Sequence, residues 1–256
     1  MILEAVNLTK KYRGLTAVNS YTLRIEPGII HGLIGPNGAG KTTVFNMLTS
    51  LVQPTEGKVL FLGEDITRKR PDQIAGLGLA RTFQNIRLFK ELSVLENIMI
   101  AAQIHKKYGL FSTLLCLPSF KQEEKEIVHK AEQLLETVGL IALKDHKARS
   151  LSYGNQRKLE IARALALSPK LLLLDEPAAG MNPNESIELM TMIKNIRDQY
   201  DLSILLIEHD IPFVMKLCEH IQVLNYGQLI AEGNPEEIRS NPEVIRAYLG
   251  RAAEHA

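Results

Sequence analysis

The sequence has few cysteines and no excess of either charge, and each absence excludes a class of protein. Its 256 residues include only two cysteines, Cys116 and Cys218, and neither has a cysteine or histidine partner at zinc-ligand spacing. We therefore expect two reduced thiols, and neither a disulfide framework nor a zinc site. The 30 Lys and Arg residues are matched by 29 Asp and Glu residues. This near-neutral charge argues against a protein that coats nucleic acid, because such proteins carry a basic excess.

Long hydrophobic segments are also absent. The longest apolar runs, such as residues 171–174, are far shorter than the ~20 residues that a membrane-spanning helix needs. Residues 1–5 include an acidic residue and no basic region, so we expect no signal peptide. A hydrophobic content of 45% and a charged content of 23% are typical of globular proteins. We expect one large domain, or a domain with a lobe, that is soluble by itself and reaches a membrane only through a partner.

Short apolar segments alternate with helical patterns along most of the chain. The segments typical of buried strands are residues 2–8, 29–34, 59–62, 171–174, 204–207 and 221–224. The helical patterns cover residues 42–51, 122–138, 154–167, 185–200 and 211–217. This alternation predicts an α/β fold with a mostly parallel sheet. Residues 85–153 have helical patterns without a convincing strand, and we interpret them as a helical lobe inserted into the α/β core.

A glycine-rich segment follows the second apolar run and opens a helical pattern. It matches the phosphate-binding pattern G-x-x-x-x-G-K-[ST] and consists of Gly35, Pro36, Asn37, Gly38, Ala39, Gly40, Lys41, Thr42 and Thr43. Its glycines let backbone N–H groups surround phosphate oxygens, and the helix directs its positive end at the same anion. We expect Lys41 to reach the β- and γ-phosphates, Thr42 to bind Mg²⁺ and Thr43 to contact the α-phosphate. A dinucleotide-binding pattern fails, because Arg81 stands where the third glycine after Gly76 and Gly78 would be. The segment predicts a nucleoside triphosphate site.

Two adjacent carboxylates, Asp175 and Glu176, end the apolar run 171–174. The carboxyl ends of strands in open α/β sheets form the ligand crevice. Asp175 is therefore predicted to hold Mg²⁺ beside the phosphate loop, and Glu176 to polarise the attacking water.

Residues 151–157 read LSYGNQR and are similar to the LSGGQ signature of ATP-binding cassette (ABC) ATPases. Other features of that family follow its order: Tyr12 after the first apolar segment, Gln84 within TFQN and His209 after residues 204–208. The resemblance covers residues 1 to about 250. It implies a P-loop ATPase fold with a mostly parallel sheet, an antiparallel β edge and an inserted helical subdomain.

The resemblance also implies a division of the single ABC ATPase domain, residues 1–256. The catalytic core comprises residues 1–84 and 160–240, the helical subdomain residues 85–159 with the signature, and the C-terminal helix residues 241–256. Residues 108–120, the segment DEPAAGMNP at 175–183 and the ending 244–250 look like the ATPase subunits of branched-chain amino-acid importers. Relatives that serve urea import or lipopolysaccharide export share parts of this pattern, so the cargo stays an inference by analogy.

Several roles are carried over from the family. Gln84 would contact Mg²⁺ or the water, His209 would donate to the γ-phosphate and orient Glu176, and Tyr12 would stack on adenine. The signature residues would bind ATP across a head-to-tail dimer of cassettes, with a helix N-terminus as the second anion-binding end. These signature residues are Ser152, Gly154 and Asn155.

The sequence departs from the general family pattern at three positions. Tyr153 replaces a signature glycine and Asn155 replaces the usual glutamine, but backbone N–H donation survives both changes. Asn182 stands where many cassettes have aspartate, which puts an ion-pair role there in doubt.

The resemblance implies partners as well as cofactors. We expect ATP and Mg²⁺ to bind and a second cassette, identical or different, to complete the dimer. We also expect transmembrane permease subunits to anchor the chain on the cytoplasmic face of the membrane, and a solute-binding protein to act indirectly. The apolar residues 108–120 either cover the core of the helical lobe or form part of the permease-docking surface. No nucleic-acid partner is expected.

Two rival classes remain. Non-transport cassettes of chromosome structure and repair carry long coiled-coil insertions, whereas the segment between Lys41 and Ser152 is short. Ribosome-acting cassettes usually have two cassettes in one chain. A P-loop kinase or GTPase would lack the signature, and the guanine-reading Asn-Lys-x-Asp motif is absent.

Overall fold

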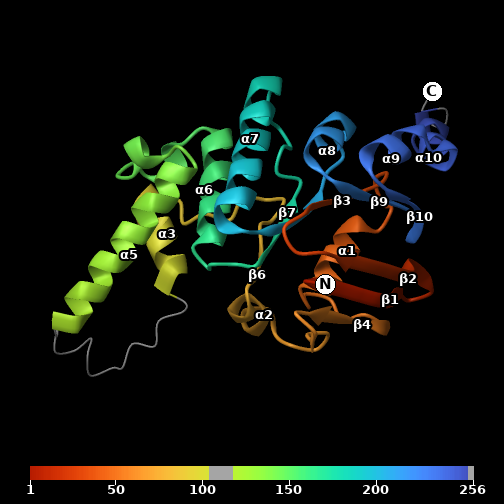
Figure 1. The fold of residues 1–256 in the computed structure, drawn as a ribbon, viewed down its shortest axis with the longest axis horizontal. Coiled ribbons are helices and arrows are strands. Elements are labelled where there is room, and N and C mark those ends of the chain that lie inside the picture. The colour runs from red at the N-terminus through yellow and green to blue at the C-terminus, as the bar shows by residue number, and fades with distance from the viewer. Residues whose placement is uncertain (104–117, 253–256) are drawn as a thin grey trace.

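The computed structural model describes residues 1–103 and 118–252. In this part of the chain, two sheets pack with helices around them (Figure 1). The larger sheet has six strands in the order β10-β9-β3-β8-β7-β6. Its neighbouring strands are parallel except β9 and β10, which are antiparallel. These strands are β3 (Ile30–Ile34), β6 (Leu79–Arg81), β7 (Leu171–Asp175), β8 (Ser203–Ile207), β9 (His220–Asn225) and β10 (Gln228–Gly233).

The smaller sheet is antiparallel and has the order β2-β1-β4-β5. Its strands are β1 (Leu3–Tyr12), β2 (Leu15–Ile25), β4 (Glu56–Phe61) and β5 (Glu64–Asp65). The predicted fold class is confirmed: a mostly parallel sheet with an antiparallel β edge and a helical region. The strand segments predicted from apolar runs all lie on observed strands, whereas β2, β5, β6 and β10 were not predicted.

The central strands are buried on both faces, and this explains their continuous apolar sequence. Alternate residues of β7 enter different hydrophobic clusters: Leu171 and Leu173 pack with helix α1 (Lys41–Leu48) and the antiparallel sheet. Leu172 and Leu174 pack into the cluster formed with the other helices. Since side chains alternate across a strand, both faces need apolar residues. The site-bearing ends of β3 and β7 are therefore held by two cores at once.

Most of the remaining helices pack against the second cluster, and α3, α5 and α6 form a group at one end of the molecule (Figure 1). The helices are α2 (Pro71–Leu77), α3 (Val94–Ala102), α5 (Pro118–Thr137), α6 (Tyr153–Leu165), α7 (Pro183–Tyr200), α8 (Ile211–Leu217), α9 (Pro235–Ser240) and α10 (Pro242–Ala252). Short 3-10 turns cover Ile141–Leu143 and Ala148–Ser150. The predicted helical lobe corresponds to this group, although α6 crosses the predicted subdomain boundary at residue 159. The division into subdomains therefore stays a prediction.

Two further expectations, on residues 108–120 and on membrane-spanning segments, can be compared only with the described residues. The apolar segment 108–120 lies almost wholly outside them, since only residues 118–120 belong to α5, and its role stays open. Within residues 1–103 and 118–252, no helix has both the length and the apolar character needed to cross a membrane.

Candidate functional site

The phosphate loop lies between the end of β3 and the start of α1, as the sequence predicts. Gly35 has φ +152° and Gly40 has φ +108°, both in the region that disfavours residues with a side chain. A Cβ atom on Gly35 would lie 2.1 Å from the carbonyl oxygen of Leu224, and one on Gly40 would lie 2.7 Å from that of Ala17. These two glycines are required because neighbouring backbone approaches the loop directly.

The side chain of Lys41 is folded over this loop. Its Nζ atom donates to the carbonyl oxygens of Gly35 at 2.6 Å and Pro36 at 3.0 Å, and the residue is only 6% exposed. Lys41 is the first residue of α1, and these bonds hold its ammonium group against the first two residues of the loop. This arrangement suits a site for an anion such as a triphosphate.

A cavity of about 490 Å³ opens over the loop. It brings together most of the predicted loop residues with Gln84 and Glu176, which follow β6 and β7 in the chain. Its lining residues are Leu15, Thr16, Ala17, Asn37, Gly38, Ala39, Gly40, Lys41, Thr42, Thr43, Gln84, Glu176 and Tyr226.

Four of the lining residues were not predicted: three at the start of β2 and Tyr226 in the turn between β9 and β10. Hydrogen bonds attach this turn to the loop and to β2, because Gly227 donates to the Ala39 carbonyl at 2.8 Å and accepts from Asn19 of β2 at 2.8 Å. A Tyr-Gly turn was the only sequence signal for Tyr226, and it does not indicate a distant site.

Tyr12, the predicted adenine-stacking residue, does not line this cavity. It ends β1, its side chain is 44% exposed, and the ammonium of Lys10 lies 5.0 Å from its ring centroid. The aromatic residue on the cavity wall is Tyr226. Stacking by Tyr12 stays a prediction.

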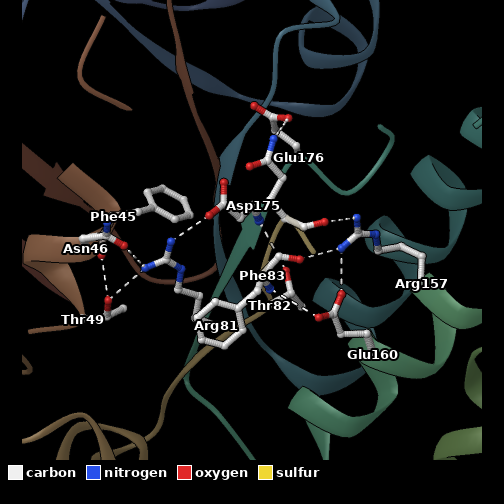
Figure 2. Close-up of polar contacts among 11 residues, drawn as sticks. Phe45, Asn46, Thr49, Arg81, Thr82, Phe83, Arg157, Glu160, Asp175 and Glu176 are labelled. Atoms are coloured by element: carbon white, nitrogen blue, oxygen red, sulfur yellow. Dashed lines mark hydrogen bonds and ion pairs between the residues drawn. The ribbon is translucent and has the colours of Figure 1, made fainter. Parts of the chain in front are cut away.

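Asp175 and Glu176 leave β7 in different directions (Figure 2). The Asp175 carboxylate is almost fully buried, and its Oδ2 atom lies 2.7 Å from Nη2 of Arg81. Glu176 has φ +48°, an uncommon conformation for a residue with a side chain, and its N–H donates to the carbonyl of Ile207 at 2.9 Å. This bend turns Glu176 toward the cavity while Asp175 stays beside α1.

Glu176 and Gln84 line the cavity, and His209, which is absent from its lining within the described residues, approaches Glu176 from outside. Nε2 of Gln84 donates to Oε2 of Glu176 at 2.9 Å, and Nδ1 of His209 lies 3.8 Å from the same oxygen. His209 is exposed and follows Glu208, whose buried carboxylate accepts N–H bonds from Ala178 at 2.7 Å and His209 at 3.1 Å. Burial raises the pKa of Glu208. Glu208 thus fixes the backbone on which His209 sits, a role that its position in the sequence did not reveal.

The signature residues lie apart from the cavity of their own chain. Ser152 caps α6, and its Oγ accepts the N–H bond of Asn155 at 3.4 Å. Gly154 is buried against α7, where a Cβ atom would lie 3.3 Å from Oε1 of Glu185. Ser152, Gly154 and Asn155 are absent from the lining of the phosphate-loop cavity within the described residues.

Asn182, whose ion-pair role the sequence left in doubt, has a structural function at the start of α7. Its Oδ1 atom accepts N–H bonds from Asn184 and Glu185, both at 3.0 Å, and the Asn182 N–H donates to Oε2 of Glu185 at 3.0 Å. This reciprocal pattern is a capping box at the start of α7. A neutral amide suffices for it.

Three predicted magnesium ligands supply oxygen atoms, which suit this hard cation. Thr42 and Gln84 line the cavity, and Asp175 lies behind it with its Oδ2 held by Arg81. No cluster of three or more His, Cys, Asp or Glu side chains able to hold a metal occurs in residues 1–103 and 118–252. The residues therefore fit a cation that the nucleotide helps to ligate, not an all-protein metal site.

Comparisons with known proteins agree with this geometry. The family model described as ABC transporter matches residues 18–179, and a model described as branched-chain amino acid ATP-binding cassette transporter matches residues 228–254. The high-affinity branched-chain amino acid transport ATP-binding protein LivG of Escherichia coli is 47% identical over 98% of both chains. The lipopolysaccharide export system ATP-binding protein LptB of Acidithiobacillus ferridurans is 36% identical over 97% of both.

A solved structure gives the same result for the fold. An ATP-binding cassette of an ABC transporter in its ADP conformation matches with a TM-score of 0.85 and 34% identity, over 97% of this chain and 98% of that chain. The chain belongs to the ATP-binding cassette family of ABC transporter ATPases.

Proposed function

We propose that this chain is the ATP-binding and ATP-hydrolysing subunit of a transporter that imports branched-chain amino acids. The observation that carries the ATPase role is the meeting of Glu176, Gln84 and His209 at the rim of the phosphate-loop cavity. The cargo is supported by relatives whose names specify branched-chain amino acid transport, LivG at 47% identity and BraF of Pseudomonas aeruginosa at 46%.

Each residue has a task that follows from its place. The loop N–H groups and Lys41 bind the β- and γ-phosphates, and Glu176 accepts a proton from the attacking water. Gln84 holds the Glu176 carboxylate through Nε2 and keeps its amide oxygen for the cation or the water. His209 donates to the γ-phosphate from beside Glu176. Thr42, Asp175 and Gln84 would hold Mg²⁺, and the bound cation would neutralise charge on the phosphates.

The separation between the signature and the cavity supports a head-to-tail dimer. In such a dimer, the Ser152 end of α6 faces the triphosphate bound by the other cassette. The N–H groups of Gly154 and Asn155 then add donors at a positive helix end. The dimer mate is either a second copy or a related subunit. Binding to permease subunits places the pair on the cytoplasmic face of the membrane, and a solute-binding protein delivers the cargo from the other side.

The first experiment tests hydrolysis with purified protein. Glu176→Gln should keep nucleotide affinity and lower the steady-state rate of phosphate release by about 10²–10⁴-fold, because an amide cannot accept the proton. Glu188→Gln is a matched control, since this exposed carboxylate on α7 pairs with Lys158 outside the cavity. Phosphate release by Glu176→Gln at the wild-type rate would refute the assignment of Glu176.

The second experiment tests the cargo in cells from which the gene is deleted. Uptake of radiolabelled leucine, isoleucine and valine should fall and return with the wild-type gene but not with Glu176→Gln. Unchanged amino-acid uptake together with a defect in lipopolysaccharide export or urea uptake would replace the proposed cargo. That outcome would leave the ATPase assignment intact.

A further inference from the structure

Arg157 is a buried arginine on the signature helix, five residues after the capping Ser152, and its side chain is 0% exposed. Its Nη1 atom donates to the Phe83 carbonyl at 2.8 Å and to Oε2 of Glu160 at 2.7 Å. Its Nη2 atom donates to the Gln84 carbonyl at 2.9 Å and to the hydroxyl of Tyr153 at 3.2 Å. Figure 2 shows the guanidinium between the Phe83 carbonyl and the Glu160 carboxylate.

The segment held by Arg157 carries a residue of the hydrolysis site. Arg157 binds the backbone of Gln84, and the side chain of Gln84 binds Glu176 at 2.9 Å. Glu160 contributes from the same helix, because its Oε1 accepts N–H bonds from Phe83 and Arg87, both at 3.4 Å. The Arg157–Glu160 pair therefore fixes the peptide groups on both sides of the Gln84 side chain.

Stability alone does not account for this pair. Removing two charges from water is costly, and apolar residues of similar volume often stabilise a protein at least as well. Apolar residues cannot, however, donate hydrogen bonds to two consecutive carbonyl oxygens. The planar guanidinium, with several donors in a fixed fork, can bridge them.

We propose that Arg157 is a positioning residue for ATP hydrolysis, which holds residues 83–84 so that the Gln84 amide stays on Glu176. The inference rests on the proposed ATPase function and assigns a new residue to it. Because Arg157 belongs to the helix that Ser152 caps, it joins the signature segment to the hydrolysis residues of the same chain. In the proposed dimer, the triphosphate of the other cassette thereby acts on Gln84 through α6.

A double-mutant cycle tests the route through Gln84. Arg157→Met with Glu160→Met removes both charges, so that neither stays buried alone. We expect this pair of changes to lower kcat by about 10-fold or more while nucleotide Kd changes less than about twofold. In a Gln84→Ala background the same pair should lower kcat by less than about twofold, because the Gln84 side chain that Arg157 positions is already absent. Single-turnover phosphate release keeps slow variants measurable.

Equal losses of kcat in both backgrounds would overturn the proposal, since a merely structural effect does not depend on Gln84. The variant Arg157→Lys adds a second criterion: it keeps the charge but cannot bridge both carbonyls and the Tyr153 hydroxyl. We expect it to remain slow, and wild-type kcat in Arg157→Lys would also contradict the proposal.

Lys158→Met with Glu188→Met is the matched control. This neighbouring pair joins α6 to α7 at 3.1 Å and is partly exposed. It should leave kcat unchanged in both backgrounds. If the wild-type chain failed to hydrolyse ATP, the proposed function would fail. If wild type and Glu176→Gln behaved as expected and the cycle were additive, only the role of Arg157 would fail.

Discussion

Arg81 and Asp175 form a buried ion pair in which Nη2 lies 2.7 Å from Oδ2, with side chains only 7% and 6% exposed. Nη1 of the same guanidinium donates to Oδ1 of Asn46 at 2.8 Å and to Oγ1 of Thr49 at 3.2 Å, while its carbon lies 5.4 Å from the ring centroid of Phe45 (Figure 2). One side chain thus connects the acidic end of β7 with the helix that follows the phosphate loop. Arg81 fixes how far these two parts of the site lie apart.

Arg81→Met should destabilise the protein strongly, because it leaves the buried Asp175 carboxylate without its cation. Breaking a buried pair in this way costs about 3–5 kcal/mol of unfolding free energy. Urea unfolding of the nucleotide-free chain measures the loss. Arg81→Met with Asp175→Asn should recover part of it, since no charge then stays buried alone. Arg70→Met is the control, because the Arg70–Asp72 pair is exposed and its loss should not be measurable.

The parts of the fold that were predictable are those in which a local pattern reflects burial. Strands β3, β7 and β8 are buried at every residue, so their sequences are mostly apolar, with His31, Asp175 and Ser203 as polar exceptions. Strand β2 mixes exposed and buried positions, and its polar residues removed the apolar signal. Strand β10 was missed for the same reason, since it lies at the edge of the larger sheet and half of its residues are exposed.

The site residues also divide into those that a local sequence pattern predicts and those that it does not. The phosphate loop could be predicted because its chemistry is contained in nine consecutive residues, Gly35 to Thr43. Arg81 and Arg157 could not, because their partners lie 94 and 73 positions away in Asp175 and Gln84. Nothing in the local sequence distinguishes a buried arginine that binds distant backbone from an exposed one.

Gly40→Ala should weaken nucleotide binding through the backbone. An added Cβ would lie 2.7 Å from the Ala17 carbonyl oxygen, and φ is +108°. The loop must shift away from β2, which carries one wall of the cavity. We expect nucleotide Kd to rise by about tenfold or more, equivalent to about 1.4 kcal/mol, when measured with a fluorescent ATP analogue.

Gly63→Ala separates this steric effect from the cost of the backbone conformation. Gly63 has φ +80°, but an added Cβ would meet no atom within 4 Å. It should lose some stability and keep wild-type nucleotide affinity. Equal changes in Kd for both variants would contradict the proposed contact with Ala17.

His209→Ala should lower kcat by about 10²-fold with little change in nucleotide Kd, because its Nδ1 lies 3.8 Å from Glu176 Oε2 beside the cavity. His209→Gln, which keeps a hydrogen-bond donor, should retain more activity than His209→Ala. The exposed His146 provides a matched control, and His146→Ala should hydrolyse ATP at the wild-type rate. A lower nucleotide affinity at unchanged kcat would instead assign His209 to binding.

His31 should make the protein sensitive to acid. The residue is 0% exposed in β3, neither ring nitrogen has a hydrogen-bond partner among the residues that the structure describes, and the His220 ring lies 4.9 Å away. Burial, assisted by the charge of His220, lowers the pKa of His31 from 6.5 to about 3. Between these values the unfolded chain binds a proton that the folded chain excludes. Stability is therefore fully present above about pH 6.5 and decreases as the pH falls toward 3.

His31→Leu removes this proton linkage while keeping an apolar side chain of similar size. The difference in unfolding free energy between wild type and His31→Leu should change in favour of the variant by about 1.4 kcal/mol per pH unit below pH 6. Urea unfolding at intervals from pH 7.5 to pH 5 gives the two curves. Parallel curves would mean that folded His31 accepts the proton as readily as the unfolded chain does. Because the slope reports proton uptake, a constant packing difference between histidine and leucine offsets the curves without changing it.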